Sequence, residues 1–523
     1  MLLAPSNMPV SRKGIFARNI SSNLAGYLVN AAVMFLLTPF VLQELGDGPY
    51  GIWSVLIATT GSYGIFDLGI RSAAGLYLTR YSAQDDAEGV NRSFSTAFVL
   101  LSGLAVVGLL ATVGLASQLP EFLGSRSSGE IDPGAVGRDA QAAFLVIGAS
   151  VSLCLPLALF QAVTYAKERM DLSNGLGILE RLLIAGLSVW SLQAGYGLFG
   201  LSCVVGGVQL VIAAARVLVA RRLMPGLRVS PGRFSSGAVR ELLSYGVYNS
   251  LVNAADRVVL AAGAVIALVA IDEYAVTYYE NGAKLIPIYT QLVLAVTWTI
   301  TPYATKLDAQ GDRAQLRRLL VEGTRGSTFL AAVIGGGLIF VGEPFLGVWL
   351  GPKYIEGGEF VSSGWILALL AIGSLARSAS SCGRQVLFAT RRVRRLAAMS
   401  AADVVCTLGL SVALVGPAGI EGLAWATMAP AWVIYFGWQT VSVCRCVGLP
   451  VVQLVRAQLT SILPTLAVMF AFDFFVRRWL PGDNWGEVLV RSAVMFAAAM
   501  LVGYSIVRAR IADLRGGGAA TER

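Results

Sequence analysis

The sequence contains no histidine, and only 14% of its 523 residues are charged. Without imidazole side chains, histidine metal ligands, Ser-His-Asp catalysis and histidine proton relays are excluded. Soluble globular proteins carry about 25% charged residues. A chain of this length with so little charge does not cover its own surface in water, so we expect lipid to solvate much of it.

Cysteine is also scarce, and its placement indicates no cofactor. The six cysteines lie inside or at the edges of apolar runs, a pattern of buried free thiols and not of a disulfide framework. Cys444 and Cys446 have neither a second cysteine pair nor a histidine to complete a metal site. The sequence also lacks the G-x-x-x-x-G-K-[ST] phosphate loop of ATP-driven pumps. We therefore predict no metal and no cofactor.

The basic residues are dispersed along the chain. The formal net charge is +9, which could suggest a nucleic-acid partner, but Lys and Arg form short clusters between long apolar runs and no single patch or tail. We predict membrane lipids as partners, and no nucleic acid.

Long apolar runs are what the sequence does contain. Hydrophobic residues make up 56% of the chain, and mean hydropathy is +0.68. A helix that crosses a bilayer needs about 20 mostly apolar residues. We therefore predict an all-α integral membrane protein with about 14 transmembrane helices. The runs lie near 20–42, 50–66, 93–116, 140–163, 174–192, 196–219, 243–270, 275–303, 326–350, 362–388, 396–415, 420–444, 457–476 and 490–508.

The distribution of basic residues predicts the orientation of these spans. With a cytoplasmic amino end, 30 of the 40 Lys and Arg fall in cytoplasmic segments and 6 in external ones, as the positive-inside rule requires. One missed or extra span would invert the later loops and destroy this alternation. We predict that both termini are cytoplasmic.

A cytoplasmic stretch divides the spans into groups. Residues 223–241 contain Pro225 and Pro231 and form the predicted linker. The predicted domains are an amino-terminal six-helix lobe, a second six-helix lobe, and two further helices with a cytoplasmic tail. The longest external loop, about 117–139, is rich in Gly and Ser and predicts a flexible connector. The predicted ranges are 1–222 for the first lobe, 223–241 for the linker, 242–446 for the second lobe and 447–523 for the last two helices with the tail.

Short motifs in both halves resemble the bacterial polysaccharide and O-antigen flippases of the multidrug/oligosaccharidyl-lipid/polysaccharide exporter superfamily. Each motif is short, and the match lies in their order and spacing over most of the chain. The residues are Leu37-Thr38-Pro39, Leu45-Gly46, Tyr50-Gly51-Ile52-Trp53 and Phe66-Asp67-Leu68-Gly69-Ile70 in the first half, and Asp256-Arg257, Tyr274, Pro302 and Leu307-Asp308-Ala309-Gln310 in the second.

This resemblance implies two pseudo-symmetric six-helix lobes around a central cavity, which work by alternating access. It also implies a substrate, an oligosaccharide on polyprenyl pyrophosphate that moves from the cytoplasmic to the external leaflet for cell-surface polysaccharide assembly. Such a protein would lie in the bacterial inner membrane and could have other polysaccharide-assembly proteins as partners. The related lipid II flippases also have two extra terminal helices, which could form an apolar groove for the lipid tail.

Cations inside the spans are the candidate substrate-binding residues. A charge at mid-bilayer costs about 2.5–3.5 kcal/mol on the insertion scale, so it is rare without a function or a partner. Arg257, Lys284 and Arg377 lie within predicted spans and together would cradle a pyrophosphate. Asp256 and Tyr278 complete the predicted site, the tyrosine by stacking on sugar rings.

Structural interpretations of the same residues remain open. Glu280 precedes Lys284 by four residues and could simply neutralise it, as could Asp256 from the preceding helix. Tyr278 suits an interfacial aromatic belt equally well. Asp403 could bind a coupling ion, and Asp473 lies near the external surface, where we expect solvent around it.

Two other functions compete with the flippase. A cation-coupled multidrug exporter of the same superfamily would share the fold, but its cavity would be acidic, whereas the interior charges here lean basic. A membrane-embedded polysaccharide polymerase or glycosyltransferase would present a large loop or a domain with paired carboxylates, and the sequence shows neither. We therefore predict a transporter and no enzyme.

Overall fold

The computed structural model describes residues 10–67, 69–124, 133–167 and 169–518, which form helices and no strand. Leu68 of the first-half motif and residues 125–132 of the predicted external loop lie outside the described residues. The chain separates into two compact units. The first comprises Met1–Arg257 with Asp272–Tyr274, and the second comprises Val258–Ile271 with Ala275–Arg523.

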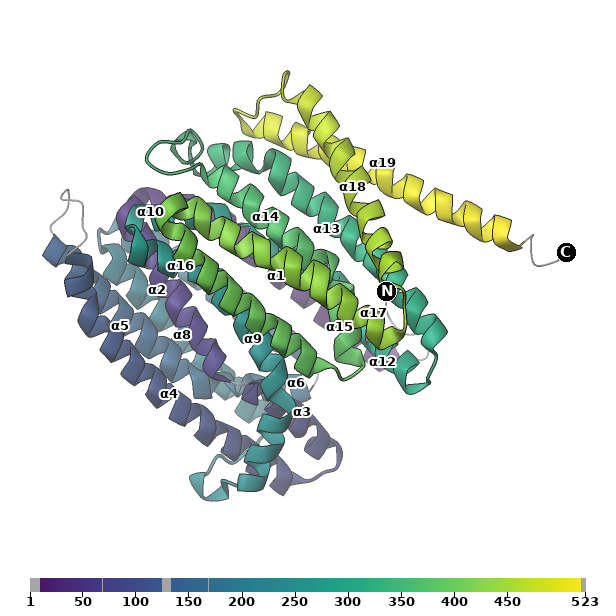
Figure 1. The fold of residues 1–523 in the computed structure, drawn as a ribbon. Coiled ribbons are helices and arrows are strands. Elements are labelled where there is room, and N and C mark those ends of the chain that lie inside the picture. Colours follow the sequence, from purple (N-terminus) through teal and green to yellow (C-terminus); the bar gives the residue numbers. More distant parts are fainter. Residues whose placement is uncertain (1–9, 68, 125–132, 168, 519–523) are drawn as a thin grey trace. The chain divides into compact units, whose positions relative to one another are not determined.

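The first unit is built on a pair of long helices, α4 and α5, with α8 packed against α5 (Figure 1). A buried cluster in this unit includes Phe94 and Leu101 of α4, together with Ile70, Leu78 and Leu159. The elements are α1 (Val10–Leu45), α2 (Asp47–Gly61), the 3₁₀ helix η1 (Ser62–Asp67), α3 (Ile70–Ala83), α4 (Ala87–Gly124), α5 (Pro133–Ala158), α6 (Gln161–Ala166), α7 (Met170–Gln193), α8 (Gly197–Leu223), the 3₁₀ helix η2 (Pro231–Arg233) and the first part of α9 (Ser236–Ala270).

The second unit is centred on α13, which packs against α14, α18 and α19 (Figure 1). Its elements are the end of α9, α10 (Glu273–Ala283), α11 (Ile286–Thr297), α12 (Ile300–Ala309), α13 (Arg313–Leu350), the 3₁₀ helix η3 (Pro352–Tyr354), α14 (Ser363–Ala379), α15 (Ser381–Ala389), α16 (Val393–Ala431), the π-helix η4 (Trp432–Gln439), α17 (Thr440–Val447), α18 (Val451–Val476) and α19 (Trp485–Gly518).

The chain is a multi-pass membrane protein. Among the described residues, 12 helices are long and apolar enough to cross a bilayer. One of these stretches, Val393–Val447, is 55 residues long and is interrupted at Gly419, where φ is +54°. The predicted second span corresponds to α2, which has only 15 residues before η1 begins. The exact number of fourteen spans stays a prediction.

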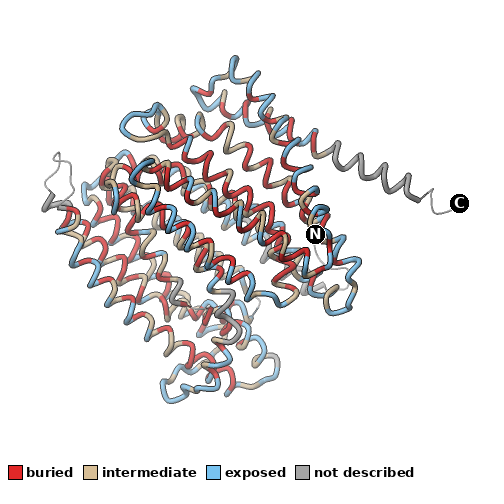
Figure 2. The backbone as a smooth tube through the Cα atoms, viewed as in Figure 1, coloured by how far each residue is buried: buried red, intermediate tan, exposed pale blue. Residues whose placement is uncertain are grey.

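The exposed faces of these helices are apolar, as a lipid solvent requires. Figure 2 shows buried faces inside each unit and exposed residues along the outer faces of the helices. Large aliphatic and aromatic side chains lie on those exposed faces, among them Leu110, Val211, Val405, Val433 and Phe475. A soluble protein does not expose so many large apolar side chains on contiguous faces.

Two predicted spans are broken helices and not single ones. The run 275–303 is divided into α10, α11 and α12, with turns at Lys284 and Trp298. Pro287, in the first turn of α11, has no amide hydrogen to continue the ladder from α10. The run 362–388 is divided at Ser380 into α14 and α15. Broken helices at membrane depth are tolerated only where protein or a polar cavity satisfies their backbone groups.

The predicted linker is tied to the first unit. α8 ends at Leu223 and α9 begins at Ser236. Between them, the Asn91 side-chain oxygen accepts a hydrogen bond from the Arg228 amide at 2.7 Å, and the Ser95 hydroxyl accepts one from Ser230 at 3.1 Å. These bonds hold the segment on α4. The division of the chain into lobes at this linker stays a proposal.

The interpretation of Asp473 as a solvated surface residue was wrong. Asp473 is only 7% exposed, and its carboxylate accepts two hydrogen bonds from the Arg491 guanidinium at 2.7 and 3.2 Å. The same guanidinium donates to the carbonyl oxygens of Pro481 and Phe340. The pair therefore joins α18 and α19 to α13, because a buried charge needs a partner and further hydrogen bonds.

Candidate functional site

The candidate site lies in the second unit, at the two helix breaks. Lys284 occupies the turn between α10 and α11. Arg377 lies in the last turn of α14, immediately before the break at Ser380. Two of the three predicted cations thus sit beside interrupted helices. Discontinuous helices are where transporters commonly place substrate and ion sites, since the freed backbone groups are polar.

Side chains from distant helices donate hydrogen bonds to the backbone carbonyls that are freed at the break between α14 and α15. The Gln439 amide donates to the Ser380 carbonyl at 2.6 Å, and the Gln458 amide donates to the Ala379 carbonyl at 3.4 Å. Thr328 of α13 also donates to Ala379, at 3.2 Å. The sequence analysis missed both glutamines. Their signal was available, because a glutamine inside an apolar run needs a polar partner.

Arg377 is neutralised by Asp403 in this structure. Its Nη2 lies 3.1 Å from Asp403 Oδ2, and the Asp403 side chain is 1% exposed. The Tyr435 hydroxyl donates to the same carboxylate at 3.1 Å, and the Arg377 guanidinium lies 5.4 Å from the centre of the Tyr435 ring. Tyr435 belongs to the π-helix η4, and π-helical turns are frequent at functional sites. Asp403 thus pairs with an internal cation in this structure, and its binding of a coupling ion stays a prediction.

Several buried polar atoms of the second unit have no hydrogen-bond partner within the described residues, and others occur in the first unit. Those of the second unit include Arg377 Nε, both side-chain polar atoms of Asn281, Gln439 Oε1 and Gln458 Oε1. A buried polar group without a partner costs about 1–3 kcal/mol, so such groups are rare in a sealed core. The atoms of Arg377, Gln439 and Gln458 lie on residues at or next to the break between α14 and α15, where they could bind polar groups.

Lys284 has an acidic neighbour, as the sequence allowed. It acts electrostatically on Glu280, one turn earlier on α10. The helix that precedes Lys284 packs closely on α14, because an added Cβ at Gly282 would come within 2.7 Å of the Ser363 carbonyl oxygen.

Tyr278 lies among other aromatic side chains near the loop between α13 and α14. Its ring centre is 5.3 Å from that of Tyr354 and 5.4 Å from that of Phe360. Its hydroxyl donates to the Lys353 carbonyl at 3.4 Å. These contacts explain the position of Tyr278 by packing within the protein. Its contact with sugar stays a prediction.

Arg257 and Asp256 belong to the first unit, on α9. The Arg257 side chain is exposed, and its guanidinium lies directly against Gly64 of η1, where an added Cβ would collide with Nη1. The glycine thus makes room for the cation. Lys284 and Arg377 belong to the second unit, so the convergence of the three cations on one substrate stays a prediction.

An apolar cavity of about 470 Å³ lies between α13 and the last two helices. Met469, Met495 and Phe496 belong to the last two helices, which we predicted to form a lipid-tail groove, and line the cavity together with Gly337 and Leu338 of α13. The prediction named that groove by its helices and not by these residues. The lining of this cavity is mostly apolar, and its role in guiding a lipid tail stays a proposal.

Comparisons with known proteins agree with this architecture. Residues 140–357 match the family described as "Polysaccharide biosynthesis protein". The chain is 24% identical to the probable flippase AglR of Haloferax volcanii over 417 residues, which cover 79% of each protein.

Two solved structures share the fold. A lipid II flippase MurJ in an inward closed conformation has a TM-score of 0.68 at 15% identity, over 94% of this chain and 100% of that one. An inward-facing multidrug resistance MATE family transporter of the MOP superfamily has a TM-score of 0.62 at 13% identity, over 79% and 95%. The chain therefore shares the fold of these two transporters, and the family match and the flippase relative confirm the predicted resemblance to polysaccharide flippases.

Proposed function

We propose that this chain is a flippase that moves an oligosaccharide on polyprenyl pyrophosphate from the cytoplasmic to the external leaflet by alternating access. The observation that carries the proposal is the placement of Lys284 and Arg377 beside helix breaks in a polar interior. The family match and the flippase named among the relatives support a membrane transporter of polysaccharide precursors. The chain would act as a transporter and not as an enzyme, in the bacterial inner membrane, with both termini cytoplasmic.

The Arg377–Asp403 pair suggests how an anionic head group is accepted. A guanidinium held in the membrane without a partner would be costly, and Asp403 compensates it at 3.1 Å. A pyrophosphate offers bidentate acceptor oxygens that match a guanidinium. We infer that the substrate replaces Asp403 as the partner of Arg377. When the head group leaves on the external side, the Arg377–Asp403 ion pair forms again. The Arg377 guanidinium of the empty transporter is therefore always compensated.

The proposal is tested in vesicles that contain the purified protein and a fluorescent polyprenyl-pyrophosphate oligosaccharide. A membrane-impermeant reductant bleaches only the outer leaflet, so flipping converts the protected half of the signal into bleachable signal. Vesicles with the protein should lose nearly all fluorescence, and protein-free vesicles about half. If the glycolipid stays protected while a cationic drug is transported, the multidrug-exporter alternative replaces this proposal.

A substitution at Gly337 tests the role of the apolar cavity. An added Cβ at Gly337 meets no atom within 4 Å, and the residue lines the cavity. Gly337→Leu should therefore fill the cavity at little cost in stability. We expect flipping of a long-chain polyprenyl substrate to fall about tenfold, the factor for a loss of about 1.4 kcal/mol, with less effect on a short-chain analogue.

The matched control for this variant is Gly409→Leu. Gly409 is exposed on α16, its added Cβ also meets no atom, and it does not line the cavity. Flipping by the control should equal that of the unmodified protein. Equal loss for the long and short substrates in Gly337→Leu would remove the tail-guiding role.

A further inference from the structure

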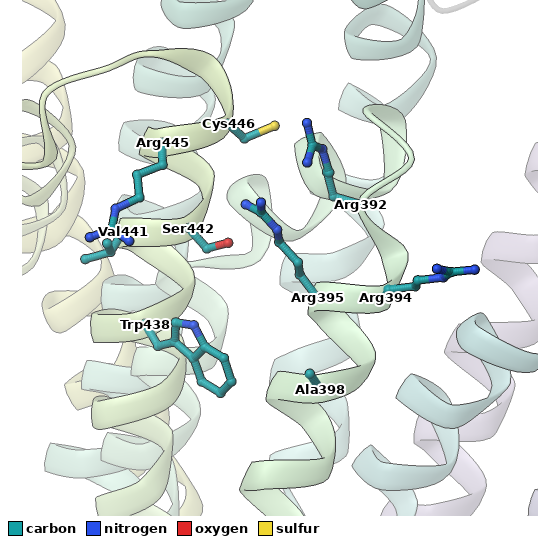
Figure 3. Close-up of a pocket in the computed structure, with 9 residues that line it drawn as sticks. All are labelled: Arg392, Arg394, Arg395, Ala398, Trp438, Val441, Ser442, Arg445 and Cys446. Atoms are coloured by element: carbon teal, nitrogen blue, oxygen red, sulfur yellow. The ribbon is translucent and has the colours of Figure 1, made fainter.

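A second, basic cavity lies outside the site described above, where α16 begins and α17 ends. It has a volume of about 480 Å³, within the range of about 300–1,000 Å³ of small-molecule sites. Four of its nine lining residues are arginines and none is acidic. The lining residues are Arg392, Arg394, Arg395, Ala398, Trp438, Val441, Ser442, Arg445 and Cys446 (Figure 3).

The backbone around this cavity is fixed by specific contacts. Arg391 adopts a left-handed conformation with φ +58°, and the amide of Arg392 donates to the Leu387 carbonyl at 2.9 Å. Thr390 Oγ1 lies 3.6 Å from Cys446 Sγ, which ties this turn to the end of α17. A non-glycine residue with positive φ persists only where its surroundings hold it. The turn therefore presents its arginines in a defined place.

Three of the arginines have no acidic partner among the described residues. Within the part of the chain that the structure describes, no ion pair involves Arg392, Arg395 or Arg445. At the end of α17, two arginines of α13 already donate to the carbonyls, Arg317 to Val447 at 3.0 Å and Arg313 to Cys446 at 3.5 Å. Adjacent cations with no counter-charge repel one another, and an anion would relieve that repulsion.

Two of the four arginines face a cavity that also offers a buried hydroxyl and an apolar floor, whereas Arg394 and Arg445 extend away from it (Figure 3). Figure 3 shows Arg392 and Arg395 directed into the space between the two helices, with the Ser442 hydroxyl facing Arg395. Ser442 is 6% exposed, and no hydrogen bond involving its hydroxyl is found among the described residues. The Trp438 indole extends toward Ala398 on the side away from the arginines. Tryptophan at such a position is typical of the membrane–water interface.

We propose that this cavity binds the phosphate head group of a membrane lipid. The guanidinium groups of Arg392 and Arg395 would donate to the phosphate oxygens, and Ser442 would add a hydroxyl donor. Trp438 and Val441 would contact the glycerol or prenyl carbons next to the phosphate. Basic pockets between membrane helices bind anionic head groups in this way. The proposal does not rest on the transported substrate, since a resident phospholipid needs no transport.

The test is lipid retention by the purified full-length protein, measured by native mass spectrometry. Delipidated protein is titrated with phosphatidylglycerol, with polyprenyl pyrophosphate and with zwitterionic phosphatidylcholine. We expect phosphatidylglycerol or polyprenyl pyrophosphate to bind at least tenfold more tightly than phosphatidylcholine. The tighter of the two anionic lipids identifies the source of the phosphate.

Two variants distinguish binding in this cavity from non-specific attraction of anionic lipid to basic residues. Arg392→Gln/Arg395→Gln should weaken binding of the anionic lipid about tenfold or more. Ala398→Phe keeps every arginine and fills the cavity, and it should weaken binding by a similar factor. The control Arg221→Gln/Arg222→Gln removes two exposed charges from the end of α8 and should change binding less than twofold. Equal weakening by the control, or unchanged binding in Ala398→Phe, overturns the proposal.

Discussion

Replacing Asp403 with alanine should reduce the stability of the protein by about 3–5 kcal/mol, because it leaves the Arg377 guanidinium as an uncompensated buried charge. The Arg377 side chain is 17% exposed and the Asp403 side chain 1%. Thermal unfolding in detergent can be followed with a thiol-reactive dye, since Cys382 and Cys444 are free and buried. The variant should expose these thiols at a markedly lower temperature.

The double variant Arg377→Met/Asp403→Leu separates structure from transport. Replacing a buried ion pair with apolar side chains of similar volume is often neutral or stabilising, so the unfolding temperature should recover. If Arg377 binds the pyrophosphate, as we propose, flipping stays lost in this stable protein. A double variant that is stable and flips the glycolipid normally would show that the pair is structural.

Replacing Arg257 with alanine should abolish glycolipid export while the protein remains inserted and abundant. The side chain is exposed, so its removal leaves no buried group unpaired. Lysine at this position should restore export only in part, because an ammonium cannot bind a phosphate bidentately. Export is measured as surface polysaccharide in cells that depend on the introduced gene. Arg240→Ala, an exposed arginine near the start of the same helix, is the matched control and should export normally.

Gly64 allows the position of this charge to be tested without removing it. An added Cβ would occupy the place of Arg257 Nη1, and a long side chain moves away at little energetic cost. Gly64→Ala should therefore keep the thermal stability and lower export less than Arg257→Ala does. Normal export by both variants would show that Arg257 does not contact the substrate.

The helical, membrane-spanning character of the chain could be predicted from sequence because it depends on local composition. Each span forms its backbone hydrogen bonds within its own helix, and any sufficiently long apolar run is stable in lipid. The runs near 326–350 and 457–476 accordingly lie within α13 and α18 and end where these helices end. The breaks within the runs 275–303 and 362–388 could not be found in this way, because a turn of two residues hardly changes the mean hydropathy of a run.

The sequence by itself determined a multi-pass helical membrane protein, a flippase-like motif order, and a short set of intramembrane cations. Only the tertiary structure decided which side chains pair with those cations. Arg377 finds Asp403 26 residues away, and the break at Ser380 is satisfied by Gln439, 59 residues away. The physical reason is that a buried charge or a freed carbonyl takes whichever partner the packing of distant helices brings within hydrogen-bond distance. Sequence spacing does not encode that proximity.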